Sequence, residues 1–281
     1  MFIFKESGRL GNQLFQYAAL RTLCPKEQQL ILLGFEALQL VFYGVNAKII
    51  NGGSSKLERS LYYRFYQYAD TLSQKGIFSR IRESSESPSI HESKGLLKTV
   101  KFVEKSYFQS ESCFDLNSIE SLLLKPELLN SAKKVIEAST KGKTPIFIHV
   151  RRGDYLRWPS KASPAILSAS YYQTCINIVQ SRILNPFYIF TSDDPFYIKD
   201  IFGDLENSYI SYGSTSEDFA LMTQCSGGIL SASSFSWWAA YFAQLQGSGK
   251  LFIAPKYWAG HREQIWYPEF IESNFLTYVI A

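Results

Sequence analysis

Short apolar segments typical of strands alternate with segments typical of helices along most of this 281-residue chain, and they do so in two runs. This alternation predicts parallel sheets, because a strand reaches a parallel neighbour only through a crossover connection, usually a helix. The two runs join near Lys141-Gly142-Lys143. We therefore expect an α/β fold with two domains, residues 1–141 and residues 142–281, that face each other across a cleft. A last helix that packs back on the N-terminal domain is an open alternative for the end of the chain.

The periodicity also places the individual elements. Strands are expected at residues 1–4, 30–33, 98–103, 145–150, 187–191, 209–211, 228–231 and 250–254. Helices are expected at about residues 12–23, 116–124, 126–138, 168–183, 217–224 and 236–245, and residues 56–82 also show helical spacing. The Ser/Glu-rich residues 82–93 are typical of an exposed loop.

Charged side chains follow the apolar strand at residues 145–150, where the sequence reads His149-Val150-Arg151-Arg152-Gly153-Asp154-Tyr155. In open α/β sheets, ligands bind beyond the carboxyl ends of the strands. Arginine is always charged and presents a rigid fork of donors that suits phosphate. The two arginines are therefore candidates for a pyrophosphate clamp, and the alternative is a pair of surface arginines in ion pairs.

A glycine-containing loop, Gly8-Arg9-Leu10-Gly11-Asn12-Gln13, follows the first expected strand. Its glycines permit a tight turn and a close approach of the backbone to a ligand. Asn12 is expected to cap the next helix, whose N-terminus attracts anions. The dinucleotide fingerprint G-x-G-x-x-G and a Walker lysine are absent. An ordinary turn between strand and helix is the alternative.

A carboxylate pair, Asp193-Asp194, follows the expected strand at 187–191 and precedes Pro195. A carboxylate at a strand end can accept a hydrogen bond from a ribose hydroxyl or a base N–H. Aspartate before proline also caps helices. A ligand contact and a helix cap are both consistent with this pattern.

The sequence Ser231-Ala232-Ser233-Ser234-Phe235-Ser236-Trp237-Trp238 follows the expected strand at 228–231. Hydroxyls and backbone N–H groups at a helix start can bind an anion without any lysine, and a simple serine cap is the alternative. For the adjacent tryptophans, core packing is favoured over stacking on a sugar.

The net charge of +4 is too small to indicate a nucleic-acid-binding protein. It fits an anionic small ligand or loose contact with an anionic membrane surface. The sequence has no apolar run of about 18 residues and does not begin like a signal peptide. We expect a cytoplasmic protein, with peripheral contact at the inner membrane face as an open alternative.

The cysteines and histidines are scattered, at Cys24, Cys113, Cys175, Cys225, His91, His149 and His261. No spacing suits a metal site or a dense disulfide pattern. Buried free thiols and an absence of protein-bound metal are therefore expected.

Together these motifs resemble glycosyltransferase family 11, the α-1,2-fucosyltransferases. The resemblance covers the chain from end to end and lies in the G-x-x-G-N-Q start at residues 8–18, in residues 107–111 (Tyr-Phe-Gln-Ser-Glu), in the H-x-R-R-x-D signature at 149–155, and in residues 192–195 and 233–240. It implies a GT-B architecture of two Rossmann-like domains. It also implies metal-free, inverting transfer of fucose from GDP-β-L-fucose to the 2-hydroxyl of a terminal galactoside.

The resemblance further implies roles for individual residues. Arg151 would contact the β-phosphate and the glycosidic oxygen, with Arg152 as a secondary contact. The nucleotide would be held by His149, Asp193 and the turn Ser233-Ser234-Phe235. Asn12 would approach the fucose from the N-terminal domain, and no cofactor is required beyond the donor substrate.

The catalytic base is less constrained. Asp154 is the nearest candidate in sequence, although it could equally orient Arg151 or cap a turn. Glu6 and Glu111 are rivals. Two other functions remain open: transfer of a different nucleotide sugar on the same frame, and a non-catalytic nucleotide-binding or carbohydrate-binding module.

The acceptor is expected to be a galactose-terminated oligosaccharide or lipid-linked glycan, as in O-antigen or capsule synthesis, but no residue is assigned to it. Residues 45–95 match no motif of the family. Since loops outside a common frame usually carry specificity, we expect acceptor choice to depend on this segment and on residues 107–111. Tyr62, Tyr63 and Tyr66 are candidates for stacking on sugar faces, with core packing as the alternative.

Overall fold

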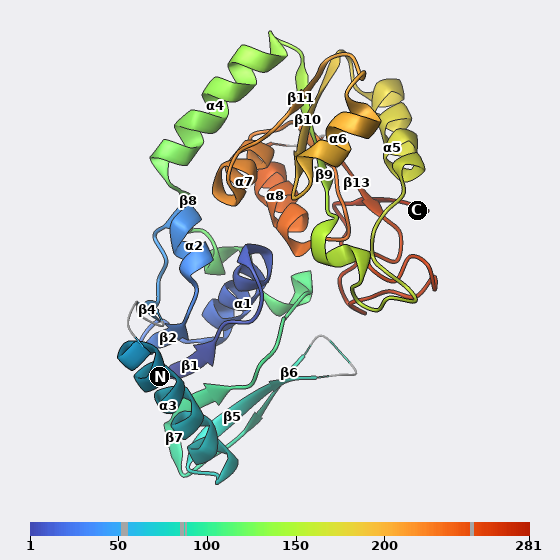
Figure 1. Cartoon of the computed structure of the whole chain (residues 1–281). Coiled ribbons are helices and arrows are strands. Elements are labelled where there is room, and N and C mark those ends of the chain that lie inside the picture. Colours follow the sequence, from blue (N-terminus) through green and yellow to red (C-terminus); the bar gives the residue numbers. More distant parts are fainter. Residues whose placement is uncertain (52–55, 85–86, 88, 248–249) are drawn as a thin grey trace. The chain divides into compact units, whose positions relative to one another are not determined.

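The computed structural model describes all residues except 52–55, 85–86, 88 and 248–249 (Figure 1). The chain divides into two compact units, Met1–Leu123 and Leu124–Ala281. Each unit has its own sheet, flanked by helices, so the expected α/β fold is confirmed. The boundary lies before α4 (Pro126–Thr140) and not after residue 141, because α4 packs against α7 (Thr215–Thr223) of the C-terminal unit.

Within the described residues, the N-terminal sheet has the strand order β4-β2-β1-β7-β5-β6. Its strands are β1 (Phe2–Lys5), β2 (Leu30–Leu33), β4 (Lys48–Ile50), β5 (Phe78–Glu83), β6 (Ile90–Ser93) and β7 (Leu97–Val103). All neighbouring pairs are parallel except β5 and β6. The helices of this unit are α1 (Leu10–Leu23), α2 (Glu36–Val41) and α3 (Lys56–Gln74), and a short strand β3 (Phe42–Tyr43) follows α2.

One part of the core of the N-terminal unit lies where α3 covers the sheet. Ile3 of β1 pairs in register with Ile31 of β2 and Phe102 of β7. These side chains are buried together with Ala69 of α3, and Tyr66 packs its ring 5.3 Å from that of Phe102. Apolar side chains on central strands thus fix the inner face of α3.

In the described part of the C-terminal unit, the sheet has the order β11-β10-β9-β12-β13-β14, and every neighbouring pair is parallel. Its strands are β9 (Thr144–Val150), β10 (Pro186–Ser192), β11 (Ser208–Ile210), β12 (Gly227–Ile229), β13 (Leu251–Pro255) and β14 (Thr277–Val279). The remaining helices are α5 (Ala169–Arg182), α6 (Pro195–Phe202) and α8 (Ser234–Leu245).

The central strand β9 is buried on both faces, as its apolar sequence predicts. Ile146 and Ile148 pack against Tyr172 and Ile176 of α5 on one face. On the other, Phe147 contacts Phe252 of β13. Because side chains pack on both faces of β9, its carboxyl end holds the start of the loop at Arg151 rigidly.

Several sequence expectations fail locally. Residues 116–124 form a 3-10 turn at Leu116–Ser118 and a short strand β8 (Leu123–Leu124) in place of a helix. Asp115 closes this turn, because its carboxylate accepts from the Ser118 N–H at 2.9 Å and its carbonyl accepts from the Ser118 hydroxyl. Local side-chain bonds of this kind compete with helix formation.

Both ends of the exposed loop expected at residues 82–93 are strands, and residues 85–86 and 88 within it lie outside the described part of the chain. Strand β5 continues to Glu83, and Arg82 pairs with His91 of β6. The strand expected at 250–254 is also not the last strand of the chain. Strand β14 adds to the sheet beside β13, and the described residues after Leu245 form strands and turns in place of a final helix that returns to the N-terminal domain.

Candidate active site

The candidate site of the C-terminal unit lies at the carboxyl ends of β9, β10 and β12. These three strands are neighbours, with β9 in the centre. His149 of β9 lies in register with Thr191 of β10. The sheet order thus brings together three loops that are distant in sequence, those after residues 150, 192 and 229, as expected for the binding edge of a parallel sheet.

Arg151 is held between two carboxylates. One terminal nitrogen, Nη2, donates to Asp154 Oδ1 at 2.5 Å, and the other, Nη1, lies 3.0 Å from Asp193 Oδ2. The guanidinium carbon also lies 5.6 Å from the centre of the Tyr155 ring. Only 15% of the Arg151 side chain is exposed. A cation fixed in this way is oriented before any ligand arrives.

Asp193 connects the loop after β10 to the loop after β9. Its Oδ1 accepts the backbone N–H of Arg152 at 2.8 Å, while Oδ2 faces Arg151. Gly153 makes this approach possible, because a Cβ atom at that position would lie 2.5 Å from Asp193 Oδ2. Since both oxygens of Asp193 contact the arginine loop, its position favours orientation of Arg151 over a direct nucleotide contact.

Arg152 and Asp194 face α6. The Nε of Arg152 donates to Asp194 Oδ2 at 3.2 Å, and its guanidinium lies 3.6 Å from the centre of the Tyr197 ring. The other oxygen of Asp194 accepts the Tyr197 N–H at 3.1 Å and caps α6. Of the two residues in this acidic pair, Asp194 is thus the helix cap, whereas Asp193 contacts the arginine loop.

His149 is fully enclosed. Its Nδ1 lies 2.7 Å from the Ser231 hydroxyl, and its ring lies 5.4 Å from that of Phe235. Burial, reinforced by the nearby charge of Arg151, lowers the pKa of His149 to about 3. His149 is therefore a neutral side chain near neutral pH and contributes shape and hydrogen bonding in place of charge.

The serine-rich turn starts α8, as the sequence suggested. Ser233 is the N-cap, and its hydroxyl accepts the Phe235 N–H at 3.3 Å. The Tyr155 hydroxyl donates to the Ala232 carbonyl at 2.8 Å and so ties the turn to the arginine loop. The N-terminus of α8, which carries Ser234, is thereby attached to the loop that carries Arg151, and its dipole favours an anion.

The adjacent tryptophans are core residues, which confirms the packing interpretation. Trp237 and Trp238 are fully buried. Trp237 stacks on Tyr241 with ring centres 5.0 Å apart and donates from its indole to Ser273. They anchor α8 and have no surface to offer a sugar.

Asp218 is a buried carboxyl group that sequence reasoning missed. It lies in the first turns of α7, which follows the carboxyl end of β11, and the Ser211 hydroxyl donates to its Oδ1 at 2.6 Å. Burial raises the pKa of Asp218 to about 7. The next residue, Phe219, places its ring 5.4 Å from that of Phe235 in the serine turn. The capping pattern from Ser214 to Glu217 predicts the start of the helix, but it does not predict that the Asp218 carboxyl group is buried.

In the N-terminal unit, Asn12 is not the expected N-cap. Helix α1 begins at Leu10, so Asn12 lies within its first turn, and Arg9 occupies the N-cap position. The Asn12 Oδ1 accepts from Gln109 Nε2 at 2.8 Å. Gly8, with a φ of +91°, is required here, because a Cβ atom would lie 2.3 Å from Asn12 Nδ2. Two segments of the family resemblance, residues 8–18 and 107–111, therefore meet at Asn12.

The rival carboxylates also belong to the N-terminal unit. Burial raises the pKa of Glu6, and its Oε2 is buried with no hydrogen-bond partner among the described residues. Glu111 lies in a 3-10 turn at Glu111–Cys113. Tyr62, Tyr63 and Tyr66 surround the Lys5 ammonium, with ring centres 4.2 to 5.8 Å away. Tyr62 and Tyr66 also pack against the core, whereas Tyr63 is half exposed.

The remaining expectations concern thiols, metals and membranes. All four cysteines are buried and free, as expected. Among the residues that the structure describes, no group of three or more His, Cys, Asp or Glu side chains is placed to hold a metal ion. In the same set of residues, no helix combines the length and the apolar character that crossing a bilayer demands.

Comparison with known proteins identifies this arrangement. The family model described as "Glycosyl transferase family 11" matches residues 93–274, which include every strand end of the C-terminal site. The chain belongs to glycosyl transferase family 11. It is therefore a glycosyltransferase.

This family 11 enzyme is similar over most of its length to a bacterial glycosyltransferase and to a mammalian fucosyltransferase. It is 26% identical to the O-antigen biosynthesis glycosyltransferase WbnK of Escherichia coli, over 90% of this chain and 93% of WbnK. It is 24% identical to galactoside alpha-(1,2)-fucosyltransferase 1 of Sus scrofa, over 88% of this chain and 66% of that protein. A match to galactoside 2-alpha-L-fucosyltransferase SEC1 of Bos taurus, at 30% identity, spans 40% of this chain and 31% of that protein.

Among solved structures, the fold of this family 11 enzyme is similar to that of POFUT1 in complex with GDP. The TM-score is 0.54 at 12% identity, over 90% of this chain and 98% of that one. POFUT1 in complex with GDP-fucose gives a TM-score of 0.54, also at 12% identity. Together with the parallel C-terminal sheet and the largely parallel N-terminal sheet, this likeness confirms the expected GT-B type of fold with two Rossmann-like units.

Proposed function

We propose that this family 11 glycosyltransferase is an inverting α-1,2-fucosyltransferase that moves fucose from GDP-β-L-fucose to the 2-hydroxyl of a terminal galactoside. Two kinds of finding support this. The relatives of Sus scrofa and Bos taurus are named galactoside fucosyltransferases, and the similar structure of POFUT1 was obtained with GDP-fucose. The observation within the chain that carries the proposal is the oriented guanidinium of Arg151.

Arg151 would stabilise the leaving group. As fucose separates from GDP, negative charge increases on the β-phosphate and the glycosidic oxygen. A guanidinium that Asp154 and Asp193 already hold in place costs little reorganisation when that charge appears. It therefore stabilises the transition state more than the bound donor, which is the condition for raising the rate.

The N-terminus of α8 would share the phosphate charge. Ser233 and Ser234 lie where the α8 dipole is most positive, and Tyr155 ties that turn to the Arg151 loop. An arginine and a helix N-terminus can both bind a diphosphate and offset part of its negative charge. We therefore propose that the reaction needs no metal ion, and that Arg152 is a secondary contact whose side chain is shared with Asp194.

The nucleoside would bind along the same edge of the sheet. His149 is neutral and enclosed beside Phe235, which suits a base or ribose better than a phosphate. Asp218 directly precedes Phe219, whose ring contacts that of Phe235. Guanine presents two adjacent N–H donors, N1–H and N2–H, and a single carboxylate can accept both. We propose that Asp218, ionised in the complex with GDP, distinguishes guanine from uracil.

The sugar and acceptor would involve the N-terminal unit. Asn12 is oriented by Gln109 and would bind the fucose. The acceptor hydroxyl must attack the face opposite to GDP and lose a proton. Asp154 is the candidate base, although its Oδ1 is paired with Arg151. A galactose-terminated oligosaccharide or lipid-linked glycan, as in O-antigen synthesis, is the proposed acceptor, in keeping with the name of WbnK.

A donor panel tests the proposal. The purified protein is incubated with lactose and with GDP-fucose, GDP-mannose, UDP-galactose or UDP-glucose in parallel, and nucleotide release and product mass are followed. Transfer from GDP-fucose alone supports the proposal. Transfer from another donor would replace it with a different sugar specificity. Nucleotide binding without turnover on a wider panel of galactosides would indicate a binding module.

A further inference from the structure

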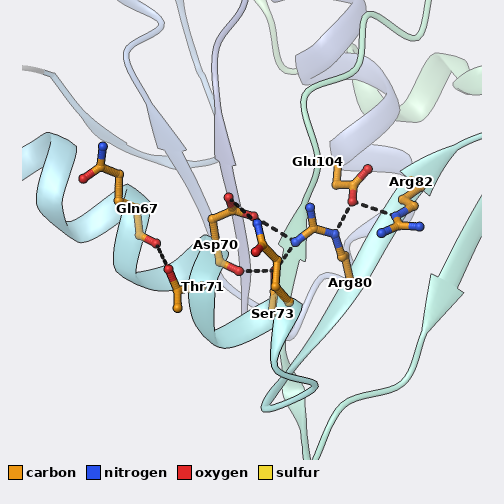
Figure 2. Close-up of polar contacts among 8 residues, drawn as sticks. Gln67, Asp70, Thr71, Ser73, Arg80, Arg82 and Glu104 are labelled. Carbon is orange, nitrogen blue, oxygen red and sulfur yellow. Dashed lines mark hydrogen bonds and ion pairs between the residues drawn. The ribbon is translucent and has the colours of Figure 1, made fainter.

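Helix α3 is attached firmly to the N-terminal sheet by its inner face. Figure 2 shows Arg80 of β5 between Asp70 of α3 and Glu104, which follows β7. Its Nη1 donates to Asp70 at 2.8 Å and to the Ser73 hydroxyl at 2.5 Å. With Tyr66 packed on Phe102, these contacts fix which face of α3 points away from the sheet.

The outer face of α3 is apolar. Leu57, Leu61, Phe65 and Tyr68 recur at helical spacing, and these residues are 45 to 70% exposed. A helix on a sheet normally presents polar side chains to water. Here the inner face is buried on the sheet and the outer face is a stripe of leucine and aromatic side chains. Contiguous exposed apolar surface of this kind marks a binding surface.

Arg64 borders this stripe, and a further leucine and two lysines lie near the C-terminal end of α3. Leu96 is 81% exposed, and its N–H donates to the Gly76 carbonyl just beyond the C-terminus of α3. Arg64 lies three residues after Leu61 and four before Tyr68, so it borders the stripe. Lys75 follows α3 directly, and Lys98 alternates along β7 with Phe102, on the face that packs against α3.

We propose that this α3 surface, formed by Leu57, Leu61, Phe65, Tyr68 and Leu96 with Arg64, Lys75 and Lys98, binds peripherally to an anionic lipid bilayer. Leucine and aromatic side chains enter the boundary between headgroups and acyl chains, while neighbouring lysine and arginine side chains pair with lipid phosphates. Both components are present on one helix and its immediate neighbours.

The charges favour a lipid surface over a second copy of the chain. Arg64, Lys75 and Lys98 give this surface a positive balance, against one carboxylate on the same helix face, Glu58, within the described side chains. Two such surfaces brought face to face would place like charges together. An anionic bilayer supplies the complementary charge and also covers the apolar stripe.

Vesicle co-sedimentation tests this inference. The full chain is mixed with vesicles of phosphatidylcholine alone or of phosphatidylcholine with about a third phosphatidylglycerol, at low and at high salt. We expect partition onto the anionic vesicles to be at least about tenfold stronger than onto neutral ones, and to weaken as salt screens the lysine and arginine charges.

Two variants with a matched control locate the surface. The first is the double variant Leu61→Gln with Phe65→Gln, which removes apolar area, while glutamine preserves the helix because its helix propensity is high. The second is Arg64→Gln, which removes one cation. We expect partition onto anionic vesicles to fall about tenfold or more in the double variant and a few fold in Arg64→Gln. The control is Leu184→Gln with Phe196→Gln, two side chains of the C-terminal unit that are 76 to 82% exposed.

The outcomes separate the explanations. Equal partition of the variants and the control, or no partition of the unaltered chain onto anionic vesicles, would overturn the proposal. A doubled mass in light scattering that the Leu61/Phe65 variant abolishes would overturn it in favour of self-association. GDP binding by calorimetry should be unchanged in all variants, which verifies that they are folded.

Discussion

The Oδ2 atom of Asp193 lies 3.0 Å from Nη1 of Arg151, although the two residues are separated by 42 positions in the sequence. The other oxygen of Asp193 accepts the Arg152 N–H. One carboxylate at the end of β10 therefore fixes both the side chain and the backbone of the loop after β9. The direction of the proposed phosphate-binding guanidinium is set by an adjacent strand.

Replacement of Arg151 tests the phosphate clamp. Arg151→Lys keeps the positive charge but loses the planar fork that contacts two carboxylates at once. We expect kcat to fall by about a hundredfold or more, the scale of losing one transition-state donor. Steady-state transfer from GDP-fucose measures this loss. Near-normal turnover would remove Arg151 from the mechanism.

Replacement of Asp193 tests its positioning role. Asp193→Asn retains an acceptor for the Arg152 N–H but weakens the hold on Arg151. We expect kcat to fall by about tenfold or more, because misorientation affects the transition state, while the KM for GDP-fucose changes little. The control is Asp204→Asn at an exposed position. A large rise in KM with kcat unchanged would instead make Asp193 a direct donor contact.

The buried Asp218 carboxyl group predicts a pH dependence of stability. Its pKa is about 7 in the folded protein and 3.8 ordinarily, so the folded state holds more protons between these values. The free energy of unfolding therefore decreases as pH rises through this window and levels off above it.

Asp218→Asn removes this contribution and leaves an acceptor for Ser211. Between about pH 5 and about pH 8, the unaltered chain should lose about 2–3 kcal/mol more stability than the variant, as measured by urea denaturation. The same variant should weaken GDP binding in calorimetry. Parallel pH profiles of the two proteins would show that Asp218 does not titrate in this range.

The proposed stabilisation of the leaving group by Arg151 and α8 predicts independence from metal ions. Transfer should persist in excess EDTA at close to its untreated rate, because in this proposal these groups stabilise the charge of the leaving group without a metal. The rate is compared with and without added Mg²⁺ or Mn²⁺. Loss of activity in EDTA that either metal restores would require a metal in the mechanism.

The sequence is sufficient to predict strand ends and the groups that follow them, because apolar runs and turn residues are local signals. Strand β2 lies at the predicted residues, Arg151 directly follows β9, and Ser233 lies in the loop after β12, as expected. The contact of Asp193 with Arg151 depends on strand order, which no local pattern contains. The sequence therefore predicts Asp193 as a nucleotide contact, whereas the structure shows both of its oxygens in contact with the arginine loop.

Burial also escapes local patterns. The capping pattern at the start of α7 is equally compatible with a buried and with an exposed side chain at Asp218. Its raised pKa results from tertiary packing. Strand β14 was missed because its three residues, Thr277–Val279, are too short for a periodicity and are stabilised by pairing with β13.

The linkage and configuration of the product test the central claim most directly. The protein is incubated with GDP-β-L-fucose and a panel of terminal galactosides, and the purified product is examined by NMR. The proposed function predicts an α-configured fucose on the 2-hydroxyl of galactose, with inversion relative to the donor. A β-configured product, a linkage to another hydroxyl, or no transfer to any galactoside would contradict it.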